Sequence, residues 1–310
     1  MESKATAVIA GKTTTQDSPK ETVSKNEGSN APKTSISDRQ EILDEYYCDA
    51  LNEHNVNKIA DGSKLNIVAI VGFADYGKTT FVSSLYHQFL TNVEFSNHTM
   101  YDSDTFIGFE RRFLIRSIQT PMEETSKRTI KGEESLLALS LDSKENGRYK
   151  LILSDKSGED YADFTGADEE IGDYIILSLA HHILFFIDTD KLLNSMASVK
   201  YSYNGLVNDL IDHEMISEKS RISVVFNKFD MVKDEQKQLY EENKKKMMEF
   251  FEGVFKSATV YPYEIDSTGA SDSFTSVKKL CDDLLSITNL TDKPNHEDLD
   301  WVKKELNDNQ

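Results

Sequence analysis

The stretch Gly72–Thr80, with the sequence GFADYGKTT, constrains the fold more than any other part of the chain. It follows an apolar run that ends at Val71 and precedes a helical pattern that begins near Lys78. A strand, a glycine-containing loop and a helix in this order are the context that a phosphate-binding loop of the form GxxxxGK[ST] requires. A similar segment, Gly11–Thr14, lacks both the first glycine and a preceding strand, and we therefore set it aside.

The residue types in this loop match the chemistry of phosphate binding. Glycines permit a tight loop whose amide groups converge on phosphate oxygens, and the N-terminus of the following helix adds partial positive charge. The lysine can reach the β- and γ-phosphates, and the hydroxyl of the next residue can bind Mg²⁺. The predicted nucleotide contacts of the loop are Gly72, Asp75, Gly77, Lys78, Thr79 and Thr80.

The pattern after residue 65 predicts an α/β fold. Short apolar runs rich in β-branched residues alternate with helical patterns, which favours a mostly parallel sheet with helices on both faces. The segment Leu136–Ser154 instead predicts a hairpin that turns at Asn146-Gly147, and hence one antiparallel edge strand. We expect strands at 65–71, 136–141, 149–154, 183–187, 222–226 and 259–265, and helices near 78–90, 168–180, 202–216, 234–256 and 270–287.

Composition divides the chain into four parts. Residues 1–36 are polar and without periodicity, which predicts a disordered arm. Residues 37–60 predict an amphipathic helix, either packed on the following domain or free to bind a partner. The main domain spans 61–290, and residues 291–310 form an acidic tail. Within the domain, phenylalanines and arginines interleave in an insertion at about 91–125, which either packs on the core or faces a partner.

Charge and cysteine content exclude several classes of function. The formal net charge of the 310 residues is −19, which argues against broad binding to nucleic acid or to an anionic membrane. No apolar run approaches the length of a membrane-spanning helix. The two cysteines, Cys48 and Cys281, have neither metal-binding spacing nor a disulfide pattern, as in a reducing cytoplasm.

Two further motifs stand at strand ends. The run Leu151–Ser154 leads into DxxG, in which Asp155 would hold Mg²⁺ and the Gly158 amide would bond the γ-phosphate. The run Ile222–Phe226 leads into NKxD, the sequence Asn227, Lys228, Phe229 and Asp230.

The NKxD motif favours guanine over adenine. The Asp230 carboxylate can accept from the base N1–H and the exocyclic amine together, a donor pair that adenine lacks. Lys228 would lie along the base, and Asn227 would brace the neighbouring loops. After the last predicted strand, Ser267 and Thr268 could place a backbone amide near the guanine O6.

These motifs resemble those of the translation-factor-related (TRAFAC) class of P-loop GTPases, over about residues 65–287. GFADYGKTT and VVFNKFDMV look like the corresponding loops of translation elongation factors. Residues 104–111, 127–129 and 155–160 are similar to the double-GTPase proteins of bacterial conflict and antiviral systems. The resemblance implies a three-layer P-loop GTPase domain and, in the narrower case, the switch subunit of a defence system.

The residues that would act in catalysis lie in the two predicted switch regions. Thr129, one hairpin before Asp155, is a better match to the Mg²⁺-binding switch threonine than the more distant Thr105. Arg128 either supplies an arginine finger in cis or is a solvated side chain. Glu159 follows Gly158 and could orient water, although its charge would repel the γ-phosphate.

Together these features predict a cytoplasmic GTP-binding switch that hydrolyses GTP to GDP and phosphate with Mg²⁺. Glu159, and Ala74 where related loops have glycine, indicate that hydrolysis is slow or stimulated by a partner. Partner proteins would sense the nucleotide state. The alternatives are a non-hydrolysing GTP-dependent scaffold, which the same two residues favour, and an ATP-dependent P-loop enzyme, which the NKxD motif opposes.

Overall fold

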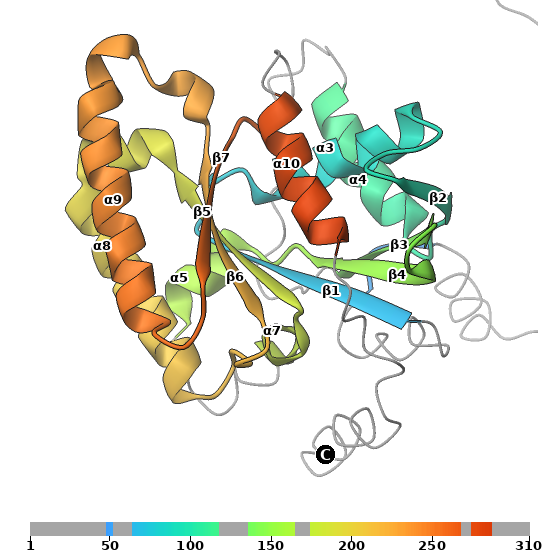
Figure 1. The fold of residues 1–310 in the computed structure, drawn as a ribbon, viewed down its shortest axis with the longest axis horizontal. Coiled ribbons are helices and arrows are strands. Elements are labelled where there is room, and N and C mark those ends of the chain that lie inside the picture. Colours follow the sequence, from blue (N-terminus) through green and yellow to red (C-terminus); the bar gives the residue numbers. More distant parts are fainter. Residues whose placement is uncertain (1–47, 52–63, 118–135, 165–173, 268–273, 287–310) are drawn as a thin grey trace, which may run out of the picture. The chain divides into compact units, whose positions relative to one another are not determined.

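The computed structural model describes residues 48–51, 64–117, 136–164, 174–267 and 274–286. Its centre is a seven-stranded sheet in the order β2-β3-β4-β1-β5-β6-β7 (Figure 1). The strands are β1 (Lys64–Val71), β2 (His98–Asp102), β3 (Leu136–Ser143), β4 (Gly147–Ser154), β5 (His182–Asp188), β6 (Arg221–Asn227) and β7 (Val260–Ile265).

The sheet confirms the predicted fold class and adds a strand to it. β4, β1, β5, β6 and β7 run parallel, and β3 is antiparallel to both of its neighbours. The predicted hairpin is present, but its turn is formed by Lys144–Asn146; Gly147, with a φ of 66°, is the first residue of β4 and pairs with Ser143. The edge, however, is β2, which lies in the predicted insertion and pairs with β3.

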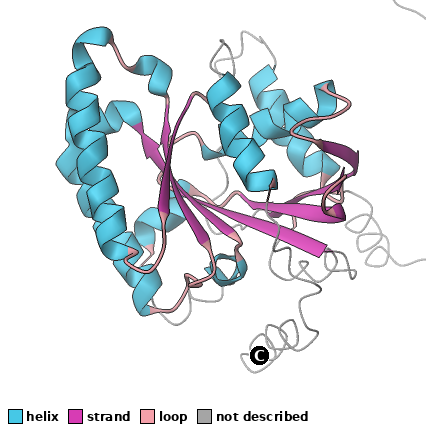
Figure 2. Cartoon of the chain, in the orientation of Figure 1, coloured by secondary structure: helices cyan, strands magenta, loops and turns pink. Residues whose placement is uncertain are grey.

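Helices cover both faces of the sheet (Figure 2). In Figure 1, α5 (Gly158–Asp163), α8 (Thr189–Asp212) and α9 (Lys237–Val254) lie on one face. The other face carries α3 (Lys78–Thr91), α4 (Phe106–Ser117) and α10 (Phe274–Leu285). A short helix, α7 (Ile175–Leu179), packs near β1, and two 3₁₀ turns, Phe229–Met231 and Asp234–Gln236, follow β6.

The central strands β1 and β5 form the middle of the core because apolar residues occupy most of their length. In β5 every residue is buried, and in β1 every residue after Lys64 is buried. Strands covered on both faces need such continuous apolar runs. None of the described helices is long and apolar enough to cross a membrane.

Two predicted helices need correction. The helix expected at 202–216 begins at Thr189, because the Asp188 carboxylate caps it by accepting from the Lys191 amide at 2.9 Å. Residues 48–51, inside the predicted helix 37–60, are not helical. Leu51 instead pairs with Leu136, the first residue of β3. The remainder of 37–60, the arm 1–36 and the tail 291–310 lie outside the described residues.

The insertion at 91–125 packs on the core where it is described. Phe109 of α4 is fully buried and stacks on Tyr86 of α3, with ring centroids 4.7 Å apart. Phe113 stacks on His87 of α3 at 5.1 Å. α4 is therefore fixed to the helix that follows the phosphate loop.

Candidate nucleotide site

The loops that carry the predicted motifs meet at one edge of the sheet. They follow the carboxyl ends of β1, β4, β5, β6 and β7, which run parallel and in register. In open α/β sheets this edge is where ligands bind.

The lysine of the phosphate loop bonds to the backbone of the same loop. The Lys78 ammonium donates to the carbonyl oxygens of Gly72 at 2.6 Å and Phe73 at 3.2 Å, and the side chain is buried. Burial lowers the pKa of Lys78 to about 8, an effect that the nearby carboxylates of Asp155, Asp75 and Asp160 oppose. Asp75 and Gly77 have φ values of 66° and 85°, which shape the tight loop.

Aromatic rings pack between the phosphate loop and α8. The ring of Phe73 lies 5.6 Å from that of Tyr76 and 5.0 Å from that of Tyr203 on α8, edge to face. The buried Tyr203 hydroxyl donates to the Phe186 carbonyl on β5. A Cβ at Gly72 would lie 3.0 Å from that same carbonyl oxygen, so glycine suits this close approach.

Thr79, Arg112, Asp155 and Gly158 make up what we name the metal end of the site. The Thr79 hydroxyl lies 3.0 and 3.1 Å from the two carboxylate oxygens of Asp155, which is fully buried. The Arg112 Nε of α4 donates to Asp155 Oδ2 at 2.8 Å. A Cβ at Gly158 would lie 2.2 Å from the Ala74 amide nitrogen, so the DxxG glycine packs directly on the phosphate loop.

The donors at the metal end fit Mg²⁺. A hydroxyl and a carboxylate are hard oxygen ligands, and Mg²⁺ typically takes few protein ligands together with substrate phosphates and water. Among the described residues no group of three or more His, Cys, Asp or Glu could hold a metal. A metal here would therefore use Thr79 and Asp155 with oxygens from a bound nucleotide.

Asp188, Asn227, Lys228, Asp230 and Ser267 make up the base end. The Asn227 amide nitrogen donates to the Tyr76 carbonyl at 2.8 Å, and its oxygen accepts from the Ser267 amide at 3.1 Å and hydroxyl at 2.7 Å. Asn227 thus ties the NKxD loop, the phosphate loop and the loop after β7 together.

Charge at the base end is partly paired. The Lys228 ammonium lies 2.6 Å from Asp188 Oδ2, on the buried carboxylate that also caps α8. Asp230 is exposed, and its pKa is raised by desolvation and by Asp266, against the lowering effect of Lys228. Asp188 was not predicted as a site residue. Its signal in the sequence is an aspartate directly after the apolar run Ile183–Ile187.

Three of the predicted site residues lie outside the described part of the chain, and a fourth is exposed. The three are Arg128, Thr129 and Thr268. Glu159 is exposed on the first turn of α5, where its amide donates to the Ser157 hydroxyl at 3.2 Å. Thr105, the switch candidate that was not chosen, is fully buried and accepts from the Ala138 amide at 2.8 Å.

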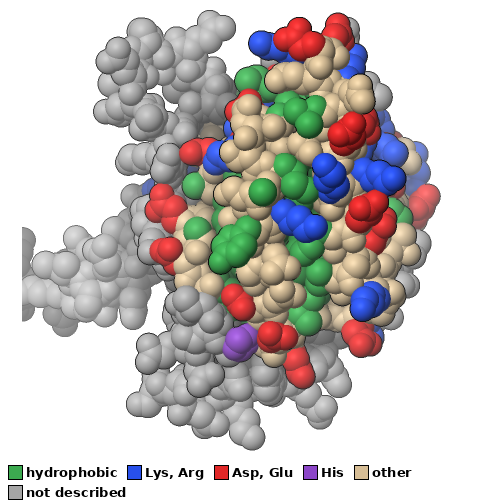
Figure 3. Space-filling model, turned by 90° about the vertical axis from the view of Figure 1, so that its left-hand side faces the viewer, with side chains coloured by type: hydrophobic (Ala, Val, Ile, Leu, Met, Phe, Trp, Pro, Cys, Tyr) green, Lys and Arg blue, Asp and Glu red, His purple; other side chains and the backbone are tan. Residues whose placement is uncertain are grey.

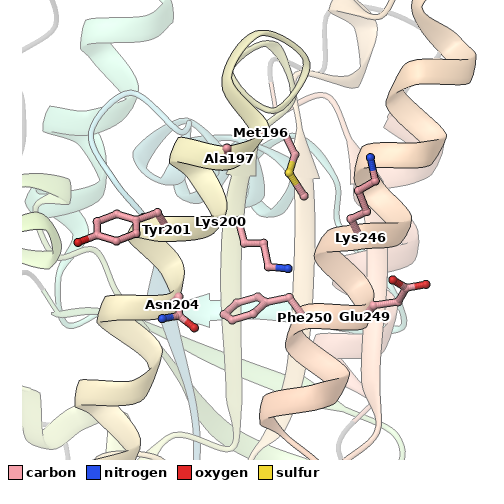
Figure 4. A pocket seen from close by; sticks show the side chains of 8 residues that line it. All are labelled: Met196, Ala197, Lys200, Tyr201, Asn204, Lys246, Glu249 and Phe250. Atoms are coloured by element: carbon pink, nitrogen blue, oxygen red, sulfur yellow. The ribbon is translucent and has the colours of Figure 1, made fainter.

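A separate hollow lies between α8 and α9. It has a volume of about 520 Å³, and Met196, Lys200, Tyr201 and Phe250 are among the residues that line it (Figure 4). Lys200 extends from α8 toward the Phe250 ring of α9, 5.8 Å from its centroid. Figure 3 shows this side of the molecule, with hydrophobic side chains among charged ones. None of the predicted site residues lines the hollow.

Comparison with known families agrees with this arrangement. The profile of the family described as Double-GTPase 2 matches residues 66–285, which include all three motifs. The chain belongs to the Double-GTPase 2 family. This member therefore carries a GTP-binding domain of the P-loop GTPase type, with the phosphate loop at Gly72–Thr80 and NKxD at Asn227–Asp230.

Solved structures similar to this Double-GTPase 2 chain include elongation factors. A bacterial selenocysteine-specific elongation factor matches at 18% identity and a TM-score of 0.37, over 74% of this chain and 30% of that one. The elongation factor SelB from Methanococcus maripaludis, in complex with the GTP analogue GppNHp, matches at 17% identity and 0.38, over 72% and 34%. The chain thus spans about a third of these proteins. No match was found among the curated proteins.

Proposed function

We propose that this chain is a GTP-dependent switch that hydrolyses GTP to GDP and phosphate with Mg²⁺, slowly by itself or faster with a partner. The hydrogen bonds of Asn227 are the main support for this proposal. These bonds, to Tyr76 and Ser267, hold the base-reading loop against the phosphate loop, so that one nucleotide can reach both.

In this proposal the residues divide the work along the nucleotide. Asp230 pairs with the guanine edge, Lys228 lies along the base, and loop amides with Lys78 neutralise the phosphates. Mg²⁺, when bound to Thr79 and Asp155, supplies charge neutralisation between the β- and γ-phosphates. Water attacks the γ-phosphorus in line, and the bond to the β–γ bridging oxygen breaks, so that GDP leaves with that oxygen. The Gly158 amide stabilises the charge on the γ-phosphoryl oxygens.

Slow hydrolysis is supported by the surroundings of the γ-phosphate position. Glu159 is a carboxylate on an exposed turn, and a negative charge there repels the phosphate oxygens. Ala74 adds a methyl group at the loop position on which Gly158 packs. Arg128 and Thr129 remain the proposed cis arginine and switch threonine, and single-turnover rates of Arg128→Ala would test the former.

Nucleotide competition tests the proposal. We expect wild type to prefer GTP over ATP, and Asp230→Asn to lose about a hundredfold or more in GTP affinity, because the paired base donors lose their acceptor. Asp234→Asn is the matched control, since Asp234 is an exposed carboxylate nearby that pairs only with Lys237 among the described residues. Preference of the wild type for ATP would refute the proposal.

A second experiment separates the switch from a scaffold. Glu159 and Ala74 also favour a protein that binds GTP and signals without hydrolysing it. Single-turnover phosphate release distinguishes the two: tight GTP binding with no release supports the scaffold.

A place in an antiviral defence system is supported by the resemblance of residues 104–111, 127–129 and 155–160 to double-GTPase proteins. Loss of protection against phage in cells with Asp230→Asn would support that place.

A further inference from the structure

Arg112 links the insertion helix to the metal end of the site. Its Nε donates to Asp155 Oδ2 at 2.8 Å, and its Nη1 donates to the Gly108 carbonyl at 2.9 Å. The Arg112 side chain is 14% exposed and that of Asp155 is fully buried. Arg112 was noted in the sequence only as one of several arginines between phenylalanines.

The charge of Arg112 disfavours a metal on the same carboxylate. Asp155 has two oxygens, and the Thr79 hydroxyl and the Arg112 guanidinium already share them. A divalent cation bound by Thr79 and Asp155 would lie close to the guanidinium in a buried place, where like charges repel strongly. Removing one partner of a buried ion pair is costly unless another charge replaces it. Either a divalent cation or the Arg112 guanidinium would neutralise the buried Asp155 carboxylate.

The first turn of α4 contacts a distant part of the chain. The Cys48 carbonyl accepts from the amides of Ile107 at 3.0 Å and Gly108 at 3.4 Å. Arg111 pairs with Asp49. A Cβ at Gly108 would lie 2.7 Å from the Ala50 amide nitrogen, so the helix and the segment Cys48–Leu51 are in close contact.

We propose that Arg112 competes with Mg²⁺ for Asp155, so that binding of Mg²⁺ with a guanine nucleotide releases α4 from the metal end. α4 then conveys the loaded state to the segment Cys48–Leu51, which it holds through backbone bonds. This inference rests on the proposed function, because it assigns a regulator to the same metal site.

The test is the Mg²⁺ dependence of GDP binding in Arg112→Ala. We expect the free Mg²⁺ concentration needed for half-maximal tightening of GDP binding to fall about tenfold, since the competing charged hydrogen bond is gone. Arg111→Ala is the matched control, because it removes the adjacent arginine of the same helix, which pairs with Asp49 instead. A change of less than twofold relative to Arg111→Ala, or a higher Mg²⁺ requirement, would overturn the inference.

A second variant and a second measurement complete the test. If Arg112→Ala does not fold, Arg112→Lys retains the charge on a side chain that cannot form the same fork, and a fall of about threefold is expected. Amide hydrogen exchange is the second readout. Mg²⁺ with GDP should speed exchange in residues 106–117 of wild type, and should leave it unchanged in Arg112→Ala. Failure of wild type to bind GDP at all would refute the proposed function itself.

Discussion

The two ends of the candidate site are held by different kinds of contact. At the base end, Asn227 makes hydrogen bonds to Tyr76 and Ser267 that no ligand needs to replace. At the metal end, Thr79 and Arg112 converge on one buried carboxylate, Asp155. Neutral bonds within the scaffold preserve a shape, whereas a charge pair can exchange one cation for another. We therefore expect the loops joined by Asn227 to keep their shape, and the proposed change of state to begin at the metal end.

Gly77→Ala should disturb the base end most. Gly77 has a φ of 85°, and a Cβ there would lie 2.0 Å from the Asn227 amide nitrogen. We expect a loss of more than about 3 kcal/mol in the free energy of unfolding. The Asn227 side chain would have to move away from its hydrogen-bond partners, and alanine is strained at this positive φ. Urea denaturation measures the loss. Gly205→Ala on α8, whose Cβ would meet nothing within 4 Å, is the control and should not destabilise.

Asn227→Ala and Thr79→Ala compare the two ends directly. Asn227→Ala removes a buried amide and leaves buried partners without it, so we expect a loss of about 2–3 kcal/mol in unfolding free energy. Thr79→Ala removes a hydroxyl whose acceptor keeps Arg112, so the loss should stay below about 1 kcal/mol. Thr79→Ala should nevertheless abolish the Mg²⁺ dependence of GDP binding. Equal losses of stability in the two variants would contradict the distinction.

A pH effect on stability is expected from the opposite ends of the strands. His182, the first residue of β5, is buried, and neither ring nitrogen has a hydrogen-bond partner among the described residues. Burial lowers its pKa to about 3, with Arg221 and His181 adding to the effect.

The sign of the pH dependence follows from that depressed pKa. The unfolded chain binds a proton below about pH 6.5, while the folded chain does so only near pH 3, so stability is complete above 6.5 and falls toward 3. Between pH 7 and 5 we expect wild type to lose about 1–2 kcal/mol through this group. His182→Gln should lose less over the same interval, measured by urea denaturation at both pH values. An identical loss in the variant would show that other groups dominate.

Local patterns in the sequence were sufficient for most of the sheet. The central strands are continuous apolar runs, and Asn146-Gly147 has the backbone preferences of a hairpin turn, so neither depends on distant contacts. The edge strand His98–Asp102 was missed because only His98 is buried, so no apolar alternation marks it. The start of α8 was missed although Leu192, Val199 and Tyr203, which are buried, recur at helical spacing; the structure also has a kink at Ser195.

The parts of the candidate site that lie within a single short motif were predictable. The phosphate loop, DxxG and NKxD are each a continuous stretch of sequence, and the structure brings Lys78, Asp155 and Asn227 to one edge of the sheet. Contacts between separate segments were not predictable. Arg112 and Asp155 are joined only because α4 packs on α3, and Leu51 is extended only because it pairs with Leu136. Such pairings depend on tertiary contacts, which override local helical preference.

The aromatic support beneath the phosphate loop has a kinetic consequence. Phe73 rests on Tyr203, and Tyr203 lies 5.6 Å from the ring of Phe251 on α9, so the loop is backed by the packed interior. A loop shaped before its ligand arrives has no ordering step to complete, and little entropy is lost when the ligand binds. Association should then be limited by encounter, and the lifetime of the complex by how fast the nucleotide dissociates.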